Sequence, residues 1–439
     1  MKLRSKSVLL LCSAIIPFSV SSTANAQAAP SAFTTGFRYD AEHRLTGTIA
    51  PDPDGAGPLK FGAVRNTYDQ AGRLIKVEKG ELAAWQGESI APSAWAGFTV
   101  LQTIDTSYDV LARKTKETLS GGSPLTVQTV TQFTYDTAGR LECTVVRMNP
   151  GAFATLPTPV CTLGAGGTYG ADRITKNLYD AAGQLVQVRE GVGTSVEAAE
   201  ATYGYTPNGK REYVIDGEGN RAKLVHDGHD RLSQWIFPSK TKPTSFNDSP
   251  ATALSSAGSV NTADYEQYGY DNNGNRTLLR MPDGRTIEFD HDALNRVTIK
   301  HFPGGTSADV GYTYDLRGLQ LTATFTATGQ GLTNGYNGFG ELISAATNVG
   351  GTARPLTYQY DANGNRTRIA HPDTTYFTYD YDGLDRLTAI RGNGGLEQVS
   401  LVYDPLGRRS QLARRNGRQT YYEYDAASRL SALTNTSFG

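Results

Sequence analysis

Residues 204–211 (GYTPNGKR) are the first stretch whose residue types could do chemistry, because Gly, four residues and Gly-Lys open a phosphate-binding loop. In such a loop, backbone amides and the lysine hold the phosphates of a nucleotide. The loop also needs Ser or Thr after its lysine, where this chain has Arg211, and a helix must follow. Residues 212–220 instead have the pattern of a strand and a turn. We therefore interpret the segment as a turn and expect no nucleotide.

Two further patterns could hold a metal ion. His226 and His229 form a histidine pair, but no third ligand stands at a matching spacing. Alternating acidic and amide residues that faintly match a calcium loop occur twice, at Asp271, Asn273 and Asn275 and at Asp361, Asn363 and Asn365. Both sets have glycine in the wrong place and no terminal Glu. We predict turns here, and no metal and no cofactor.

One basic cluster stands out near the end of the sequence. It consists of Arg408, Arg409, Arg414, Arg415 and Arg418. Strand alternation would divide these residues between two faces, so a solvated sheet face is the main interpretation and contact with an anionic surface or polymer the alternative. The formal net charge of −1 gives no global basic footprint for nucleic acid. No nucleophile–base motif is present, and we therefore predict that the chain is not an enzyme.

A heptapeptide that begins with Tyr-Asp explains most of these patterns. Its fifteen copies begin at Tyr39, Tyr68, Tyr108, Tyr135, Tyr179, Tyr205, His226, Tyr270, His291, Tyr314, Tyr336, Tyr360, Tyr381, Tyr403 and Tyr424. From Tyr270 onward the copies are 21 to 24 residues apart. GYTPNGKR contains one weak copy, in which Thr206 replaces Asp.

The heptapeptide has the chemistry of a hairpin turn. Asp at the second position caps a turn by accepting backbone hydrogen bonds. The fifth residue is Gly in nine copies and Asn or Asp in three, residues that tolerate a left-handed backbone and a G1 bulge. Asp should then pair across the strands with the sixth residue, which is Arg in nine copies. Tyr and the seventh residue, often Leu, should face each other on the opposite side.

The residues between copies predict strands and a second turn. An aromatic residue stands two positions before the anchor in nine copies, a spacing typical of a strand. Turn sequences such as Pro-Asp-Gly at residues 282–284 lie midway between anchors. The 24 tyrosines and 48 glycines suit antiparallel sheet. We predict an all-β fold, in which YD-repeat hairpins form one long antiparallel spiral sheet around a hollow shell.

The first 26 residues are predicted to be a secretory signal peptide. They combine a basic start within residues 1–6, an apolar run over residues 8–20 and Ala-Asn-Ala at residues 24–26, with Ala28 as a second cleavage site. The apolar run is too short to span a bilayer, which needs about 20 residues. A buried N-terminal helix is the alternative. We expect export by the Sec route to the periplasm, cell surface or outside, with no transmembrane segment after cleavage.

Removal of the signal leaves two cysteines, Cys143 and Cys161, which we predict to form a disulfide. Two separate buried thiols are the alternative. The domain boundaries that we expect are 1–26 for the signal peptide, 27–36 for a short lead-in and 37–439 for the YD-repeat shell. Inserted loops are expected at about 142–172 and 237–264.

The iterated Tyr-Asp anchor, Asn-Gly-Asn-Arg-Thr at residues 273–277 and 363–367, and the intervening Pro-Asp-Gly resemble the Rhs/YD-repeat proteins. That family includes bacterial Rhs and wall-associated polymorphic toxins, the C component of insecticidal toxin complexes and the teneurins. The resemblance covers about residues 32–430. It implies a hollow spiral β-shell that encloses a cargo in the toxins and belongs to an adhesive ectodomain in teneurins.

The toxin members typically end their shell with an Asp-Pro-x-Gly-Leu segment and a variable toxin domain. Here Asp404-Pro405-Leu406-Gly407 belongs to an ordinary repeat, so neither feature is recognised. The expected function is a secreted, non-catalytic shell that encapsulates or scaffolds part of a toxin-delivery or surface system. The expected partner is an encapsulated cargo or partner protein. One alternative is an adhesion module that binds a cell-surface glycan or protein, and another is the N-terminal part of a polymorphic toxin whose enzymatic tip lies elsewhere.

Overall fold

The computed structural model describes residues 31, 33–55 and 57–436. The predicted signal peptide, residues 1–26, lies outside the described residues, as does most of the predicted lead-in. Within the described part, strands and turns make up nearly the whole chain, which confirms the predicted all-β fold.

Thirty strands follow one another along the chain. They are β1 (Gly36–Tyr39), β2 (Leu45–Ile49), β3 (Phe61–Tyr68), β4 (Leu74–Leu82), β5 (Phe98–Tyr108), β6 (Lys114–Gly121), β7 (Thr126–Tyr135), β8 (Leu141–Arg147), β9 (Arg173–Tyr179), β10 (Leu185–Glu190), β11 (Ala198–Tyr205), β12 (Arg211–Asp216), β13 (Arg221–His226), β14 (Leu232–Pro238) and β15 (Val260–Tyr270). The rest are β16 (Arg276–Arg280), β17 (Thr286–His291), β18 (Val297–His301), β19 (Val310–Tyr314), β20 (Gln320–Phe325), β21 (Gly331–Tyr336), β22 (Leu342–Thr347), β23 (Arg354–Tyr360), β24 (Arg366–Ala370), β25 (Tyr376–Tyr381), β26 (Leu387–Arg391), β27 (Glu397–Tyr403), β28 (Arg409–Arg414), β29 (Gln419–Tyr424) and β30 (Leu430–Thr436).

The described helices are short pieces of the connections. They are the α-helix α1 (Ala253–Ser256) and the 3-10 turns η1 (Pro92–Ala94), η2 (Pro150–Ala152), η3 (Thr306–Ala308), η4 (Val349–Gly351) and η5 (Asn393–Gly395). None of the helices in the described part is long and apolar enough to cross a membrane.

All thirty strands belong to one antiparallel meander. Each strand pairs with the strand before it and the strand after it, from β1–β2 through to β29–β30. Because β1 and β30 are not paired with each other, the sheet is not closed by hydrogen bonds. The predicted long antiparallel sheet is confirmed.

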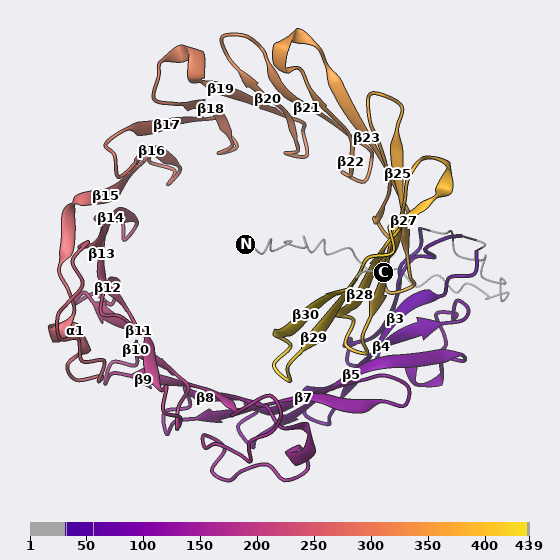
Figure 1. Cartoon of the computed structure of the whole chain (residues 1–439), viewed down its shortest axis with the longest axis horizontal. Coiled ribbons are helices and arrows are strands. Elements are labelled where there is room, and N and C mark those ends of the chain that lie inside the picture. Colours follow the sequence, from indigo (N-terminus) through magenta and orange to yellow (C-terminus); the bar gives the residue numbers. More distant parts are fainter. Residues whose placement is uncertain (1–30, 32, 56, 437–439) are drawn as a thin grey trace, which may run out of the picture.

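The sheet curves into a ring around a central opening and then overlaps its own beginning (Figure 1). The overlap is real contact, since Gln102 Nε2 donates to the backbone oxygen of Pro405 at 3.1 Å, although the two residues are 303 positions apart. The sheet is therefore a spiral of more than one turn. We call residues 36–325 (β1–β20) the first winding and residues 331–436 (β21–β30) the second winding.

The two kinds of turn lie on opposite edges of the sheet. The heptapeptide turns join each odd-numbered strand to the next even-numbered one, and we call the edge that they form the YD edge. The remaining connections form the opposite edge. Every copy shows a register shift at its anchor, such as that between Thr67 and Tyr68, which is the bulge that the sequence predicts.

The wall is one sheet thick, and packed clusters occur where long connections cover its outer face. Residues 83–97 bring Trp95 against Ile49 and Leu82. Residues 148–172 bring Cys161 against Val145. Residues 239–259, which contain α1, lie on the outside of the ring (Figure 1). Of these three connections, 83–97 is not predicted from the sequence.

Candidate functional site

The heptapeptide turn is a closed hydrogen-bonded unit, and the copy at Tyr68 shows its geometry. One carboxylate oxygen of Asp69 accepts from the backbone N–H groups of Ala71 at 3.0 Å and Arg73 at 2.9 Å. Its other oxygen accepts from Arg73 Nε at 2.7 Å. The turn thus uses both oxygens of the aspartate.

The same Asp–Arg ion pair recurs in eight of the nine copies that have Arg at the sixth position. The pairs, each 2.6 to 2.8 Å long, are Asp40–Arg44, Asp69–Arg73, Asp109–Arg113, Asp136–Arg140, Asp227–Arg231, Asp292–Arg296, Asp382–Arg386 and Asp404–Arg408. In the ninth copy, at Tyr424, the aspartate pairs with an arginine outside its own turn, as described below.

Hydrogen bonds lower the pKa values of six of these carboxylates, those of Asp40, Asp69, Asp109, Asp136, Asp227 and Asp292. Burial alone would raise the pKa of Asp227, but the backbone N–H and guanidinium of Arg231 outweigh it and lower that pKa to about 2. The backbone N–H of Arg73 is the largest influence on Asp69 and lowers its pKa too. The aspartates of these six turns therefore keep their charge to a lower pH than a free aspartate does.

The fifth residue of every copy has a left-handed backbone. Nine of these residues are glycines, such as Gly72 with φ of 78°. The other six are His43, Ala112, Asp230, Asn295, Asp385 and Ser428, with φ of 60° to 62°. The predicted conformation is confirmed, and it holds even where the residue is His, Ala or Ser.

The anchor tyrosine ties each copy to the one before it. Its hydroxyl donates to the backbone oxygen of the seventh residue of the preceding copy at 2.7 to 3.0 Å. The twelve pairs are Tyr68–Leu45, Tyr108–Leu74, Tyr135–Lys114, Tyr179–Leu141, Tyr205–Leu185, Tyr270–Leu232, Tyr314–Val297, Tyr336–Gln320, Tyr360–Leu342, Tyr381–Arg366, Tyr403–Leu387 and Tyr424–Arg409. Burial raises the pKa of Tyr403, so the donor stays protonated at neutral pH.

The sixth-position arginine reaches in the other direction, toward the next copy. Its guanidinium lies 4.5 to 5.1 Å from the centre of the next anchor ring, a cation–π geometry. The pairs are Arg44–Tyr68, Arg73–Tyr108, Arg113–Tyr135, Arg140–Tyr179, Arg231–Tyr270, Arg296–Tyr314, Arg386–Tyr403 and Arg408–Tyr424. Adjacent copies are therefore joined twice, by the hydroxyl and by the guanidinium.

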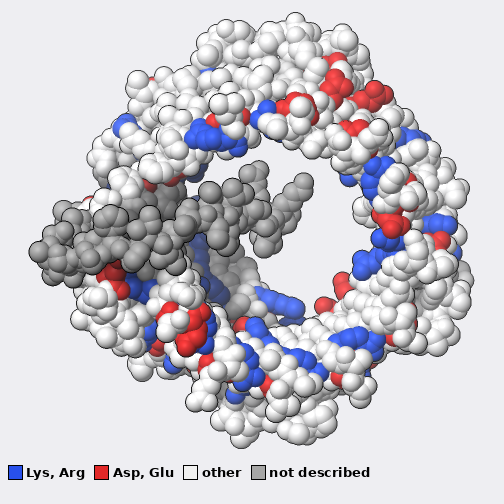
Figure 2. All heavy atoms as spheres, turned by 180° about the vertical axis from the view of Figure 1, so that it is seen from behind, with Lys and Arg blue, Asp and Glu red and all other residues white. Residues whose placement is uncertain are grey.

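Contacts with the outer connection 239–259 show which face the tyrosines occupy. Asp248 of this connection accepts from Gln187 Nε2 at 2.9 Å, and Leu254 lies beside Gly204. Gln187 and Gly204 therefore face outward. Since successive side chains of a strand point to opposite faces, Tyr203 and Tyr205 face the central opening. Lys and Arg side chains also gather along the wall of this opening, with Asp and Glu among them (Figure 2).

Histidine anchors occur where the preceding copy has no sixth-position arginine. His226 follows Lys210, and His291 follows Asn275. At His226 no hydroxyl is available for the backbone oxygen of Arg211, and the buried Nδ1 has no described hydrogen-bond partner. A cavity of about 260 Å³, lined by Lys210, Asp230 and His226 among others, lies here.

The second winding contacts the first along a line that we call the seam, at which the same two kinds of edge always meet. The YD edge of the second winding meets the opposite edge of the first. A Cβ at Gly62 would lie 2.6 Å from the backbone oxygen of Gly383, and one at Gly121 would lie 2.5 Å from that of Pro405. Glycine is therefore required where the two windings touch. Phe33 and Phe339 stack near the start of this seam with ring centres 6.0 Å apart.

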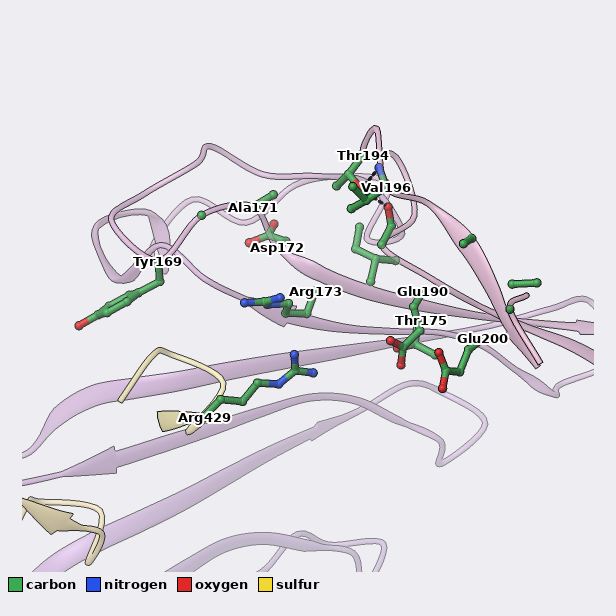
Figure 3. Close-up of a pocket in the computed structure, with 16 residues that line it drawn as sticks. Tyr169, Ala171, Asp172, Arg173, Thr175, Glu190, Thr194, Val196, Glu200 and Arg429 are labelled. Atoms are coloured by element: carbon green, nitrogen blue, oxygen red, sulfur yellow. Dashed lines mark hydrogen bonds between the residues drawn. The ribbon is translucent and has the colours of Figure 1, made fainter. Parts of the chain in front are cut away.

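The copy at Tyr424 exchanges its ion pair across the seam. Asp425, only 8% exposed, lies 3.6 Å from Arg173 of the first winding and makes no ion pair with its own Arg429. The side chains of Arg173 and Arg429 both border the space between the last hairpin and residues 169–172 (Figure 3). This pocket has a volume of about 530 Å³ and also includes Glu190 and Glu200. It is a junction between windings, with charges of both signs.

The structure places the other sequence candidates in turns. Gly209 of GYTPNGKR has φ of 81° in a hairpin turn between β11 and β12, and the strand β12 follows it where a phosphate-binding loop would have a helix. Thr206 Oγ1 caps the turn by accepting from Lys210 N at 3.0 Å. Asp271 accepts from Asn275 N at 2.8 Å, again as a turn. The described residues contain no group of three metal ligands.

The basic cluster of the second winding is divided among separate partners. Arg408 pairs with Asp404 at 2.7 Å, Arg409 lies 5.3 Å from the centre of the Tyr422 ring, and Arg414 donates to Thr420 at 3.0 Å. The side chains of these three arginines therefore serve the sheet.

Cys143 and Cys161 are joined in the structure by a disulfide, with their Cα atoms 5.9 Å apart. The bond ties β8 to the outer connection 148–172. Beside it, the buried Arg147–Asp172 pair, 2.7 Å long and 3% exposed on each side chain, holds the same connection. The sequence gives no sign of this pair, because the two residues differ from other Arg and Asp residues only in being buried by the fold.

Comparisons with known proteins bear on the same repeats. A family model described as RHS Repeat matches residues 336–376 and 360–397. The chain is similar to the crystal structure of TcdB2-TccC3-TEV, with a TM-score of 0.54 and 15% identity over 91% of this chain and 23% of that one. A crystal structure of TcdB2-TccC3 gives 0.52 and 14% over 92% and 22%. A Photorhabdus luminescens Tc holotoxin pore gives 0.52 and 14% over 92% and 21%.

The chain thus spans less than a quarter of the length of the solved chains that it matches. The sequence matches none of the curated proteins. At these identities the solved structures show a similar fold and nothing more. The iterated YD turns, the RHS Repeat match within residues 336–397 and the shared β-shell fold make this chain similar to the Rhs/YD-repeat proteins.

Proposed function

We propose that this chain is a non-catalytic wall that encapsulates or scaffolds a partner protein in an exported toxin-delivery or surface system. The observation that carries this proposal is the open ring, in which one continuous sheet surrounds a central space (Figures 1 and 2). The repeated charged and aromatic side chains are used to join copies to one another. These side chains thus hold the wall of the ring together.

The partner in this proposal is a polypeptide held within the ring. The wall of the opening carries tyrosine rings together with Lys and Arg side chains, a surface that can contact many sequences (Figure 2). Solved structures of similar fold combine TcdB2 with TccC3, which supports a role beside a partner chain. The proposal assigns a structural role to this chain and leaves any reaction to the partner.

Export is the second part of the proposal. The Sec-type signal over residues 1–26 and the Cys143–Cys161 disulfide both suit an oxidising compartment outside the cytoplasm. Thiol labelling of the protein from the periplasm or medium should leave both cysteines blocked until a reductant is added. Labelling without reductant would contradict the export proposal but would not affect the proposal that the chain forms a wall.

Electron microscopy of the purified mature chain tests the wall directly. We expect ring-shaped particles with a stain-filled centre. A solid globule or an extended ribbon would overturn the proposal. Protease protection of a co-expressed partner supplies the second measurement, and glycan binding by the isolated chain would favour an adhesion module instead.

A further inference from the structure

The two edges of the spiral are complementary, and the chain already joins them once. At the seam, turn tips of the second winding's YD edge lie on the opposite edge of the first. We call the third and fourth residues of each copy its turn tip. The seam buries the tip residue Ala426 to 5% exposure and brings Pro405 against Gly121. Small or apolar tips therefore pack against glycine-containing turns.

The first winding has apolar turn tips that no described residue covers. Leu294 is 69% exposed, and Leu316 of the following copy is fully exposed. Val110 and Leu111, which form the tip of another copy, are fully and 68% exposed. These positions correspond to Ala426, which is buried at the seam, and to Pro405, which touches Gly121 there, so the YD edge of the first winding has the chemistry of a contact surface.

The opposite edge of the second winding offers a matching surface. Val349 of η4 is 65% exposed beside Gly350 and Gly351. Leu396 is 51% exposed directly after η5, which contains Gly394 and Gly395. A Cβ added at any of these four glycines would meet nothing within 4 Å, so the surface is open to an approaching chain.

We propose that a second copy of this chain stacks on the first, so that the YD edge of one first winding lies on the opposite edge of the other copy's second winding. The contact would repeat the chemistry and polarity of the intramolecular seam. Because its two surfaces differ, the association is heterologous and can continue beyond a dimer. Stacking would lengthen the central opening without any new kind of contact.

Sedimentation of the mature chain over a range of concentrations is the first test. We expect the mass to rise above that of the monomer without stopping at two copies. Leu294→Asp with Leu316→Asp should leave a monomer, as should Val349→Asp with Leu396→Asp at the other edge. Val402→Asp is the matched control, since Val402 is an exposed apolar residue, at 51%, within β27 and away from the turn tips.

Mixing the two double variants makes the test decisive. Each variant keeps one good edge, so an equimolar mixture should form a dimer and stop there, whereas each variant alone stays monomeric. A wild-type chain that remains monomeric at every concentration would overturn the proposal, and so would association that neither double variant weakens. The particle shape seen by microscopy is a separate readout, so this proposal can fail while the wall proposal stands.

Discussion

The carboxylate of Asp425 lies 3.6 Å from the guanidinium of Arg173, so an ion pair joins the last heptapeptide of the second winding to the first. In eight other copies the equivalent aspartate pairs with the arginine of its own turn. The aspartate of the last copy therefore forms its ion pair across the seam and not within its own turn.

Breaking this pair should loosen the seam while the hairpins stay folded. Arg173→Gln should speed hydrogen exchange in β30 and at the start of β9. The loss of stability should be small, up to about 1 kcal/mol, because Arg173 is half-exposed. Arg173→Lys, which keeps a positive charge opposite Asp425, should exchange nearly as slowly as the wild type. Equal exchange in wild type and Arg173→Gln would show that the pair does not hold the seam.

Loss of one anchor hydroxyl should cost stability where it ties two copies. Tyr403 Oη donates to the backbone oxygen of Leu387 at 2.7 Å, so Tyr403→Phe should destabilise by about 0.5–1.5 kcal/mol on chemical unfolding. Tyr39→Phe is the matched control, because Tyr39 has no described preceding copy and is 60% exposed. An equal loss of stability in both variants would show that the Tyr403 hydroxyl does not join the two copies.

A tyrosine at position 226 should stabilise the sheet. His226→Tyr would place a hydroxyl near the backbone oxygen of Arg211 and fill part of the cavity beside Lys210. We expect a gain of about 1 kcal/mol, the usual net contribution of one hydrogen bond. The reverse change, Tyr270→His, should cost a similar amount, because Tyr270 Oη donates to Leu232 O at 2.8 Å. A loss of stability in His226→Tyr would show that the cavity does not accept the ring.

Glycine at position 112 should relieve backbone strain. Ala112 has φ of 60°, a left-handed conformation that costs an L-residue about 1–2 kcal/mol. Ala112→Gly should therefore raise the denaturant midpoint. Ala138→Gly, one position earlier in its own turn and without positive φ, should lower it or leave it unchanged. The same response at both sites would point to a general effect of glycine.

Acid should weaken the wall as its turn aspartates become protonated. The pKa of Asp227 is about 2 in the folded chain, below the value of about 3.9 for an unfolded aspartate. Its contribution is complete above the unfolded value and is lost as the pH falls through the folded one. Chemical unfolding should show falling stability between about pH 4 and pH 2, less steeply in Asp227→Asn. A flat profile would contradict this assignment.

The sequence predicts local features of this fold well, because the heptapeptide contains its own turn. Asp69, Gly72 and Arg73 meet within five residues, so their pairing follows from spacing alone. The tie from Tyr108 to Leu74 depends on how one hairpin lies beside the next, and spacing does not define that distance. The seam is less accessible still, since Gln102 and Pro405 meet only after the sheet has curved through a full turn.

The connection 83–97 shows a different limit. It carries Trp85 and Trp95, which pack against Ile49, Ala63 and Leu82 of β2–β4, and only three of its fifteen residues are Pro, Ser or Thr. The two predicted insertions stand out by their proline, serine and threonine content. Periodic spacing thus shows where copies begin, while the residues that fill longer intervals give little sign of their path.

Because every strand pairs with its predecessor, the wall can be built in the order in which the chain is synthesised. As each new hairpin emerges, it can pair with the last strand of the sheet. Its anchor tyrosine can then donate to a backbone oxygen of the preceding copy and stack with the arginine of that copy. Few distant contacts delay this growth, since strand pairing is local throughout. The seam is the exception, because it can begin to form only once the chain has reached Phe339, which meets Phe33, and it is completed as the last event of assembly.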